Sequence, residues 1–297
     1  MKSKLDYNRY HIVAAVVFLL PTAVFVLGFC YYPALRAIIG SFTKWDGFGD
    51  PKFVGFNNFI TLFKDPVFLV SVRNVLYWSA GSIVIVMTAP FIGAEMMFNL
   101  PSKRAQYAYR VLFVLPIVVP AVVTILIWTF IYEPSFGLLN TLLVDVLHIP
   151  RDMIPNWLGD SRLVIPSLLF MGFPWMSGLN LLIYYSGLQD ISGDVIEYAE
   201  LDGCTGFKRV LRIDIPLVGG QIRLLLILSI IGTLQNLTVP LLMTNGGPGY
   251  DSYTPGLYMY FKTFRMGDFG MGFTIATVMF VVIFILTLIS RLKAVRE

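Results

Sequence analysis

The chain is poor in charge. Of its 297 residues, 13% are Asp, Glu, Lys or Arg, while 57% are hydrophobic, and its mean hydropathy is +0.74. Soluble domains carry about 25% charged residues. This composition therefore excludes an ordinary soluble domain and indicates a membrane protein.

Cysteine and histidine are also scarce, with two of each. Cys30 lies within a long apolar run and Cys204 in a polar segment, at different depths, so no disulfide is expected. The two histidines, His11 and His148, are far apart, and the sequence contains no H-E-x-x-H pattern. The sequence predicts no metal site and no cofactor.

Motifs for catalysis and for energy coupling are missing as well. The sequence has no G-x-x-x-x-G-K-[ST] loop for ATP and no G-x-S-x-G elbow. Acidic residues are absent from the centres of the apolar segments, and Glu95 lies about one turn from a polar loop where its carboxylate can reach water. A proton-driven carrier usually needs a buried ionisable relay, so a self-contained secondary carrier is disfavoured. A membrane enzyme would need a catalytic cluster, and none is visible. The chain is not expected to be an enzyme, and the energy source must lie on another polypeptide.

Long apolar segments are what the sequence does contain. Each is near the roughly 20 residues that cross a bilayer as a helix, and the lack of strict alternation argues against a β-barrel. We expect an all-α membrane protein that forms a single transmembrane domain over residues 1–297. The six predicted membrane helices cover about 11–36, 73–98, 110–132, 163–187, 216–238 and 269–291.

Basic residues predict the orientation. They gather in four short segments, and the positive-inside rule places such segments in the cytoplasm. Both termini are therefore expected to be cytoplasmic. The net charge of +4 follows from this pattern and does not call for nucleic acid. The four clusters are Lys2, Lys4 and Arg9; Lys103, Arg104 and Arg110; Lys208, Arg209 and Arg212; and Arg291, Lys293 and Arg296.

A polar island at 190–216 separates the fourth and fifth predicted helices and holds nine charged residues. Asp194 can cap a short helix that starts at Val195, and Gly203 is placed to end it. Leu201 is expected on the apolar side of that helix. A second, basic short helix would follow. By spacing alone, the island is either a solvated loop or a surface that meets another protein.

The island resembles the EAA loop of permease subunits from bacterial ABC importers. Glu197-Tyr198-Ala199, Asp202-Gly203 and Ile215-Pro216 carry the resemblance, although Tyr198 and Ile215 depart from the usual residues. In that family this cytoplasmic loop is the coupling helix, which seats in a groove of the ATP-binding subunit. The resemblance thus implies coupling roles for Glu197, Ala199, Asp202 and Gly203.

Further motifs extend the resemblance along nearly the whole chain. They occur in the order typical of sugar importer permeases, and the last is similar to a segment of subunits related to the larger maltose permease protein. The resemblance implies the type I importer permease fold. The motifs are 53–59 with Asp65-Pro66 and Arg73-Asn74, then Leu115-Pro116 and Pro120, then 137–140, then 243–248.

Gly246, Gly247 and Pro248 cannot continue a helix and predict a tight, exposed turn after the fifth helix. The turn is either a plain loop or a contact for a docked solute-binding protein, or a part of the substrate path.

Two sets of residues are candidates for substrate binding. Ser229, Thr233 and Asn236 share one face of the fifth helix, where they either bond to neighbouring helices or line a wet path. Trp175 follows a proline expected to kink the fourth helix. In the resembling family the corresponding aromatic stacks on sugar, so Trp175 is the expected platform, and Gly172 allows close approach.

These observations predict a transport subunit of the bacterial cytoplasmic (inner) membrane. The resemblance implies a second homologous permease subunit, two ATP-binding subunits that hydrolyse ATP, and an extracytoplasmic solute-binding protein that delivers a carbohydrate, expected to be an oligosaccharide. Another polar solute, such as a glycerol phosphodiester, is the alternative substrate, and a secondary carrier is the alternative mechanism. The lipid bilayer is the other expected partner.

Overall fold

The computed structural model describes the backbone of residues 2–294 and the side chains of residue 11 and residues 13–290. The basic residues at the two chain ends lie outside the described side chains, so the predicted orientation of the termini stays a prediction. Within the described part, the regular structure is helical except for two short strands. The chain divides into two compact units: Met1–Lys64 with Met259–Phe280, and Asp65–Tyr258 with Val281–Glu297.

Unit 1 contains a long apolar helix, most of whose described side chains are exposed. From Val13 to Gly40 the helix is long and apolar enough to cross a membrane, and none of its most apolar stretch is buried. Apolar side chains left uncovered on this scale require lipid or another protein around them. This helix is α1 (Lys2–Val26), η1 (Leu27–Tyr31, a π-helical turn) and α2 (Tyr32–Gly40).

A small hairpin follows this helix in unit 1. Strands β1 (Thr43–Lys44) and β2 (Lys52–Phe53) pair antiparallel, with Thr43 opposite Phe53. The Asn58 side chain donates hydrogen bonds to the carbonyls of Ser41 and Thr43, at 3.0 and 2.9 Å, and so holds the base of the hairpin. The remaining elements of the unit are α3 (Asn57–Lys64), η5 (Phe261–Arg265, a π-helical segment) and the first part of α16 (Phe269–Ala294).

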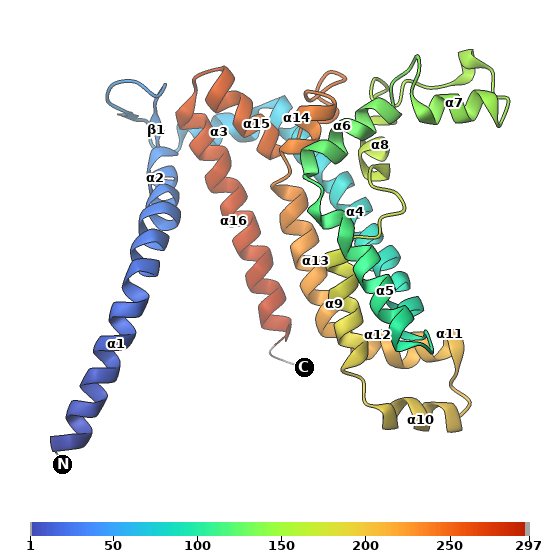
Figure 1. Cartoon of the computed structure of the whole chain (residues 1–297). Helices are drawn as coiled ribbons and strands as arrows, with labels where there is room; N and C mark the ends of the chain where they lie inside the picture. The colour runs from blue at the N-terminus through green and yellow to red at the C-terminus, as the bar shows by residue number, and fades with distance from the viewer. Residues whose placement is uncertain (1, 295–297) are drawn as a thin grey trace. The chain divides into compact units, whose positions relative to one another are not determined.

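Unit 2 is built around α4 (Pro66–Phe98), which packs against α9 and α13 on one side and against α5 and α8 along its length (Figure 1). Asp65 caps the start of α4 by accepting a hydrogen bond from the Val67 amide at 2.9 Å. The other elements in this unit are α5 (Lys103–Val114), η2 (Leu115–Val118), α6 (Ala121–Ile131), α7 (Leu138–Asp145), η3 (Arg151–Met153), α8 (Val164–Phe170), α9 (Gly178–Gln189), α10 (Gly193–Leu201), α11 (Gly206–Arg209), η4 (Val210–Asp214), α12 (Ile215–Leu217), α13 (Gly219–Leu234), α14 (Thr238–Met243) and the second part of α16, while α15 (Pro255–Tyr260) begins here.

Two apolar clusters hold unit 2 together. One joins α4, α9 and α13 through buried residues such as Phe91, Tyr184 and Leu225. The other joins α6, α8 and α14 and includes Ile125 and Leu168. The two clusters lie at different levels of α4, so this helix is the common support of both.

Three of the predicted membrane helices are not continuous. The predicted helix 163–187 is broken between Phe170 and Gly178, where we expected only a kink at Pro174. The predicted helix 110–132 bends by 87° after η2, next to Pro120, and the predicted helix 216–238 bends by 71° at the α12–α13 junction. Proline lacks the amide hydrogen that continues a helix, which explains why the breaks lie near prolines.

Within residues 2–294, three helices are long and apolar enough to cross a membrane, or up to five if each bent pair is one span. The three are Val13–Gly40, Pro66–Phe98 and Phe269–Ser290. The predicted fourth helix, 163–187, falls outside this set because its two halves are short.

Candidate functional sites at the two ends of unit 2

Helix α10 forms one end of unit 2 and lies apart from the α4–α9–α13 bundle (Figure 1). The helix begins at Gly193 with Ser192 as its N-cap residue, so the predicted start at Val195 with an Asp194 cap is wrong. Asp194 lies instead in the first turn, where its negative charge interacts favourably with the helix dipole.

Gly203 ends α10, as predicted. Its φ is +67°, a conformation that residues with a side chain rarely adopt. The amide of Cys204 donates to the Ala199 carbonyl at 2.8 Å, and the amide of Gly203 donates to the Glu200 carbonyl at 3.0 Å. This pair of bonds is the Schellman motif, so the turn after α10 has a defined shape.

A buried polar network fixes the segment after this turn to the end of α4. Arg209 Nε donates to Asp214 Oδ2 at 3.0 Å, and its terminal nitrogen donates to Asn99 Oδ1 at 2.7 Å. Asn99 in turn donates to Glu95 Oε2 at 2.9 Å. The Asp214 side chain is fully buried and that of Arg209 is 11% exposed. The network spans more than a hundred residues of sequence, and sequence reasoning missed it.

Large apolar side chains are exposed around α10. Tyr198 is 70% exposed, Leu201 78% and Phe207 76%, so Leu201, expected on the apolar side of the helix, is not covered by the rest of the described chain. Among the residues predicted to couple, Glu197, Asp202 and Gly203 are exposed and Ala199 is buried. The segment therefore presents an apolar surface rimmed by carboxylates.

The opposite end of unit 2 carries the glycine-rich turn after α14. Gly246 has a φ of +91°, and the Tyr253 ring lies where a side chain on Gly246 would be. The Asn74 amide donates to the carbonyls of Tyr250 and Tyr253, at 2.8 and 3.2 Å. Gly246 is buried and Gly247 and Pro248 are half-buried. The turn is thus tight, as predicted, but less exposed than expected.

A second tie joins the same end to the start of α4. The Tyr258 hydroxyl donates to the Asp65 carboxylate. Burial, together with the neighbouring Asp65, raises the pKa of Tyr258 above its usual range. The raised pKa keeps the hydroxyl protonated, so that it can donate this hydrogen bond.

Of the predicted polar stripe, Ser229 and Thr233 lie on α13, but Asn236 follows the end of that helix at Leu234, so the prediction that all three share one helix face is wrong. The Ser229 hydroxyl lies 3.3 Å from that of Ser82 on α4. The Thr233 hydroxyl donates to the Ser229 carbonyl at 2.8 Å, and Asn236 Oδ1 accepts from the Val239 amide at 3.3 Å. In this conformation Ser229 bonds to a neighbouring helix, as the first of the two interpretations expects, whereas Thr233 bonds within α13 and Asn236 bonds to the start of α14.

The break between α8 and α9 holds an aromatic cluster. Trp175 is half-buried with a φ of +60°, and its indole nitrogen donates to the Leu169 carbonyl at 2.9 Å. The ring meets Phe170 and Phe173 edge-to-face, with centroids 5.5 and 5.0 Å apart. Gly172 is exposed with open space beside it. Phe173, which sequence reasoning did not select, is 54% exposed and offers more free surface than Trp175.

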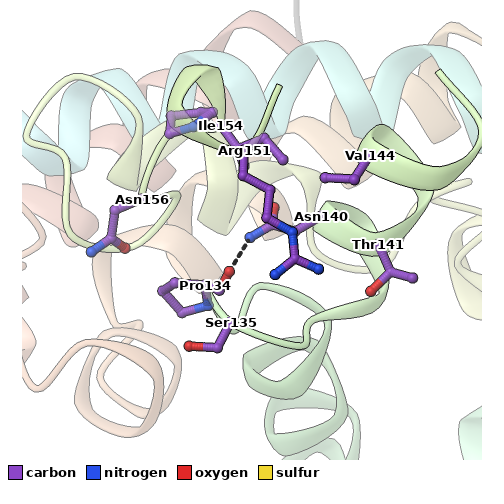
Figure 2. A pocket seen from close by; sticks show the side chains of 9 residues that line it. Pro134, Ser135, Asn140, Thr141, Val144, Arg151, Ile154 and Asn156 are labelled. Carbon is purple, nitrogen blue, oxygen red and sulfur yellow. Dashed lines mark hydrogen bonds between the residues drawn. The ribbon is translucent and has the colours of Figure 1, made fainter. Parts of the chain in front are cut away.

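A pocket of about 330 Å³ lies beside α7, at the end of unit 2 opposite α10. Figure 2 shows Arg151 reaching past Asn140, with Thr141 to one side and Ser135 below. Two hydrogen bonds hold the Asn140 side chain in this lining: it donates to the Pro134 carbonyl at 3.0 Å and accepts from the Trp157 indole at 2.6 Å.

Comparison with known proteins identifies the family. Residues 87–294 match the family of binding-protein-dependent transport system inner membrane components. The chain belongs to this family. It is therefore a multi-pass transport subunit of an inner-membrane importer, and in such importers ATP hydrolysis takes place on separate subunits. The predicted family resemblance is confirmed.

Relatives match along nearly the full length. The chain is 30% identical over 305 residues to the diacetylchitobiose uptake system permease protein NgcF of Streptomyces coelicolor, covering 98% of this chain and 85% of the relative. It is 30% identical over 304 residues to the lactose transport system permease protein LacF of Rhizobium radiobacter, covering 99% and 98%.

A solved structure shares the fold. A chain of a bacterial alginate ABC transporter, solved in complex with an alginate pentasaccharide-bound periplasmic protein, matches with a TM-score of 0.82 at 22% identity. The match covers 96% of this chain and 94% of that chain. This likeness shows the fold.

Proposed function

We propose that this protein is the membrane-spanning subunit of an ATP-driven importer that moves a carbohydrate delivered by an extracytoplasmic solute-binding protein. The observation that carries the proposal is the α10 segment, 190–216, in a chain of this family. It combines a defined Schellman turn, an apolar surface and a buried anchor to α4. The names of the relatives, which include uptake systems for diacetylchitobiose and lactose, support a carbohydrate as the substrate.

The α10 surface is proposed to seat on an ATP-binding subunit. Tyr198, Leu201 and Phe207 supply an exposed apolar contact, and such contacts contribute about 25 cal/mol per Å² of apolar area that they bury. Glu197 and Asp202 form its rim, while Ala199 and Gly203 set its shape. A second permease subunit and two ATP-binding subunits complete the proposed assembly.

We further propose six membrane crossings with both termini in the cytoplasm. Three are unbroken helices, two are the bent pairs, and the sixth is α8 with α9 despite the break at 171–177. The end with α10 is then cytoplasmic. The opposite end, with Gly246, Gly247, Pro248 and the pocket beside α7, faces the solute-binding protein.

Substrate is proposed to pass along α13 and the broken fourth helix. Trp175 and Gly172 supply an aromatic surface and open space, with Phe173 as an additional platform. Ser229, Thr233 and Asn236 would have to exchange their internal hydrogen bonds for sugar hydroxyls when the path opens. The break between α8 and α9 offers backbone carbonyls along the same path, since helical pairing ends there.

The test is reconstitution of the purified complex with candidate solute-binding proteins and measurement of ATPase activity. Sugar-loaded binding protein should raise ATPase activity above that with the empty binding protein. Leu201→Asp should abolish copurification of the ATP-binding subunit, whereas Leu147→Asp, also exposed but at the other end of unit 2, should not. Uptake that continues without the ATP-binding subunit would instead support a secondary carrier.

A further inference from the structure

A second pocket, of about 420 Å³, lies between α4, the start of α8 and the segment after the glycine-rich turn. Its volume falls within the range of small-molecule sites, about 300 to 1,000 Å³. Its lining is polar at one side and apolar at the other. The residues that matter below are Arg73, Tyr77, Ser161, Arg162, Leu169 and Asp251.

The polar side of this pocket offers donors and an acceptor in fixed positions. Arg73 forms an ion pair with Asp251 at 3.3 Å and contacts Asn74 Oδ1 at 3.3 Å. The two side chains of the ion pair are 55% and 30% exposed, so their remaining hydrogen-bonding positions face the pocket or water. Planar guanidinium and carboxylate groups side by side can bind neighbouring hydroxyls of one ring.

Two lining side chains are free to receive a ligand. Tyr77 is 64% exposed, and its side chain makes no ring contact or hydrogen bond within the described part of the chain. The guanidinium of Arg162 likewise has no hydrogen-bond or ion-pair partner among the described residues. Tyrosine has a flat apolar face and a polar tip, which suits the apolar face and the hydroxyl edge of a pyranose.

The walls are held in place before any ligand arrives. The Asn74 amide bonds to the carbonyls of Tyr250 and Tyr253, which fixes the segment that carries Asp251 against α4. On the other wall, Gly81 lets Leu169 pack closely against α4. Leu169 also accepts the hydrogen bond from the Trp175 indole at 2.9 Å. Leu169 therefore both lines this pocket and bonds to Trp175 in the aromatic cluster.

We propose that this pocket is an outer subsite for a sugar ring, with Tyr77 as its stacking platform and Arg73, Asp251 and Arg162 as its hydroxyl-binding groups. The proposal rests on the proposed function and adds a position that a sugar occupies before it reaches Trp175. The Leu169 backbone links the two positions.

Thiol protection tests the subsite directly. In a Cys30→Ser, Cys204→Ser background of the assembled transporter, Ser161→Cys places one thiol in the pocket wall. Lactose, diacetylchitobiose and maltotriose, each without binding protein, should slow maleimide labelling at this position. Ser135→Cys, in the pocket beside α7 (Figure 2), is the matched control and should be labelled at an unchanged rate.

Variants of Tyr77 complete the test. Tyr77→Ala should raise the sugar concentration for half protection about tenfold, equal to about 1.4 kcal/mol, while Tyr77→Phe keeps the ring and should retain protection. The subsite is refuted if none of the three sugars slows the labelling of Ser161→Cys. It is also refuted if the sugars protect this position equally well with and without the Tyr77→Ala substitution. ATPase stimulation by loaded binding protein is measured in the same preparation, so a failure of the subsite is distinguished from a failure of the proposed function.

Discussion

Asn74 shows how one side chain can determine the shape of a distant loop. It is 2% exposed on α4, and its two amide hydrogens satisfy carbonyls of a segment about 176 residues later in the chain. A buried carbonyl that loses its donor destabilises the fold, since it is not compensated by water. The conformation of the glycine-rich turn thus depends on α4 as well as on its own glycines.

Asn74→Ala should lower the stability of the purified protein by about 1 to 3 kcal/mol, because it leaves the Tyr250 and Tyr253 carbonyls without their donor. Thermal unfolding in detergent measures this. Thr88→Val on the same helix is the control, since the exposed Thr88 hydroxyl bonds to carbonyls of its own helix. Equal melting temperatures for the two variants would contradict the role given to Asn74.

At the scale of elements, the turn after α10 depends on backbone conformation. Gly203 and Gly193 both have open space beside them, but Gly203 has a positive φ and Gly193 does not. A side chain in the left-handed region costs about 1–2 kcal/mol. Gly203→Ala should therefore weaken copurification of the ATP-binding subunit, and Gly203→Pro should abolish it. Gly193→Ala should leave it intact, and a loss of similar size in that variant would argue against the turn as the cause.

The buried network makes a second prediction at this scale. Arg209→Met should destabilise the protein by about 3–5 kcal/mol, because the fully buried Asp214 carboxylate loses its counter-charge. Arg212→Met, on the same segment but exposed, should have little effect. Adding Asp214→Leu to Arg209→Met should recover part of the loss in a thermal unfolding assay. If the double variant is no more stable than Arg209→Met, the ion pair does not explain the effect.

The elements also show what could be predicted from the sequence. The end of α10 was predictable, since Gly203 follows a short amphipathic helix and has a local signature. The break at 171–177 was not, because it is held by packing among Phe170, Phe173 and Trp175 that local propensity does not reveal. The network of Arg209 and Asn99 was equally hidden, since it joins residues far apart in the sequence.

At the scale of the whole molecule, composition predicted the class and the motifs predicted the family, because apolar length and an ordered set of short patterns survive at 30% identity. The substrate position was less predictable. Polar residues on a membrane helix form hydrogen bonds either with a neighbouring helix or with a ligand. In this conformation the Ser229 hydroxyl lies within hydrogen-bond distance of Ser82. A sequence pattern gives the face of a helix, but only the packed structure gives its partner.

The orientation across the membrane is the prediction that unites the two ends of unit 2. Cys204 follows the α10 turn and is half-buried, while Ser135 lies beside α7 at the other end. With Cys30→Ser, a membrane-impermeant maleimide should leave Cys204 unlabelled in intact cells and label it after permeabilisation. In the same Cys30→Ser background, Ser135→Cys combined with Cys204→Ser should react with this maleimide in intact cells that lack an outer-membrane barrier. Labelling of Cys204 from outside would invert the proposed topology and remove the α10 surface from the side where ATP is available.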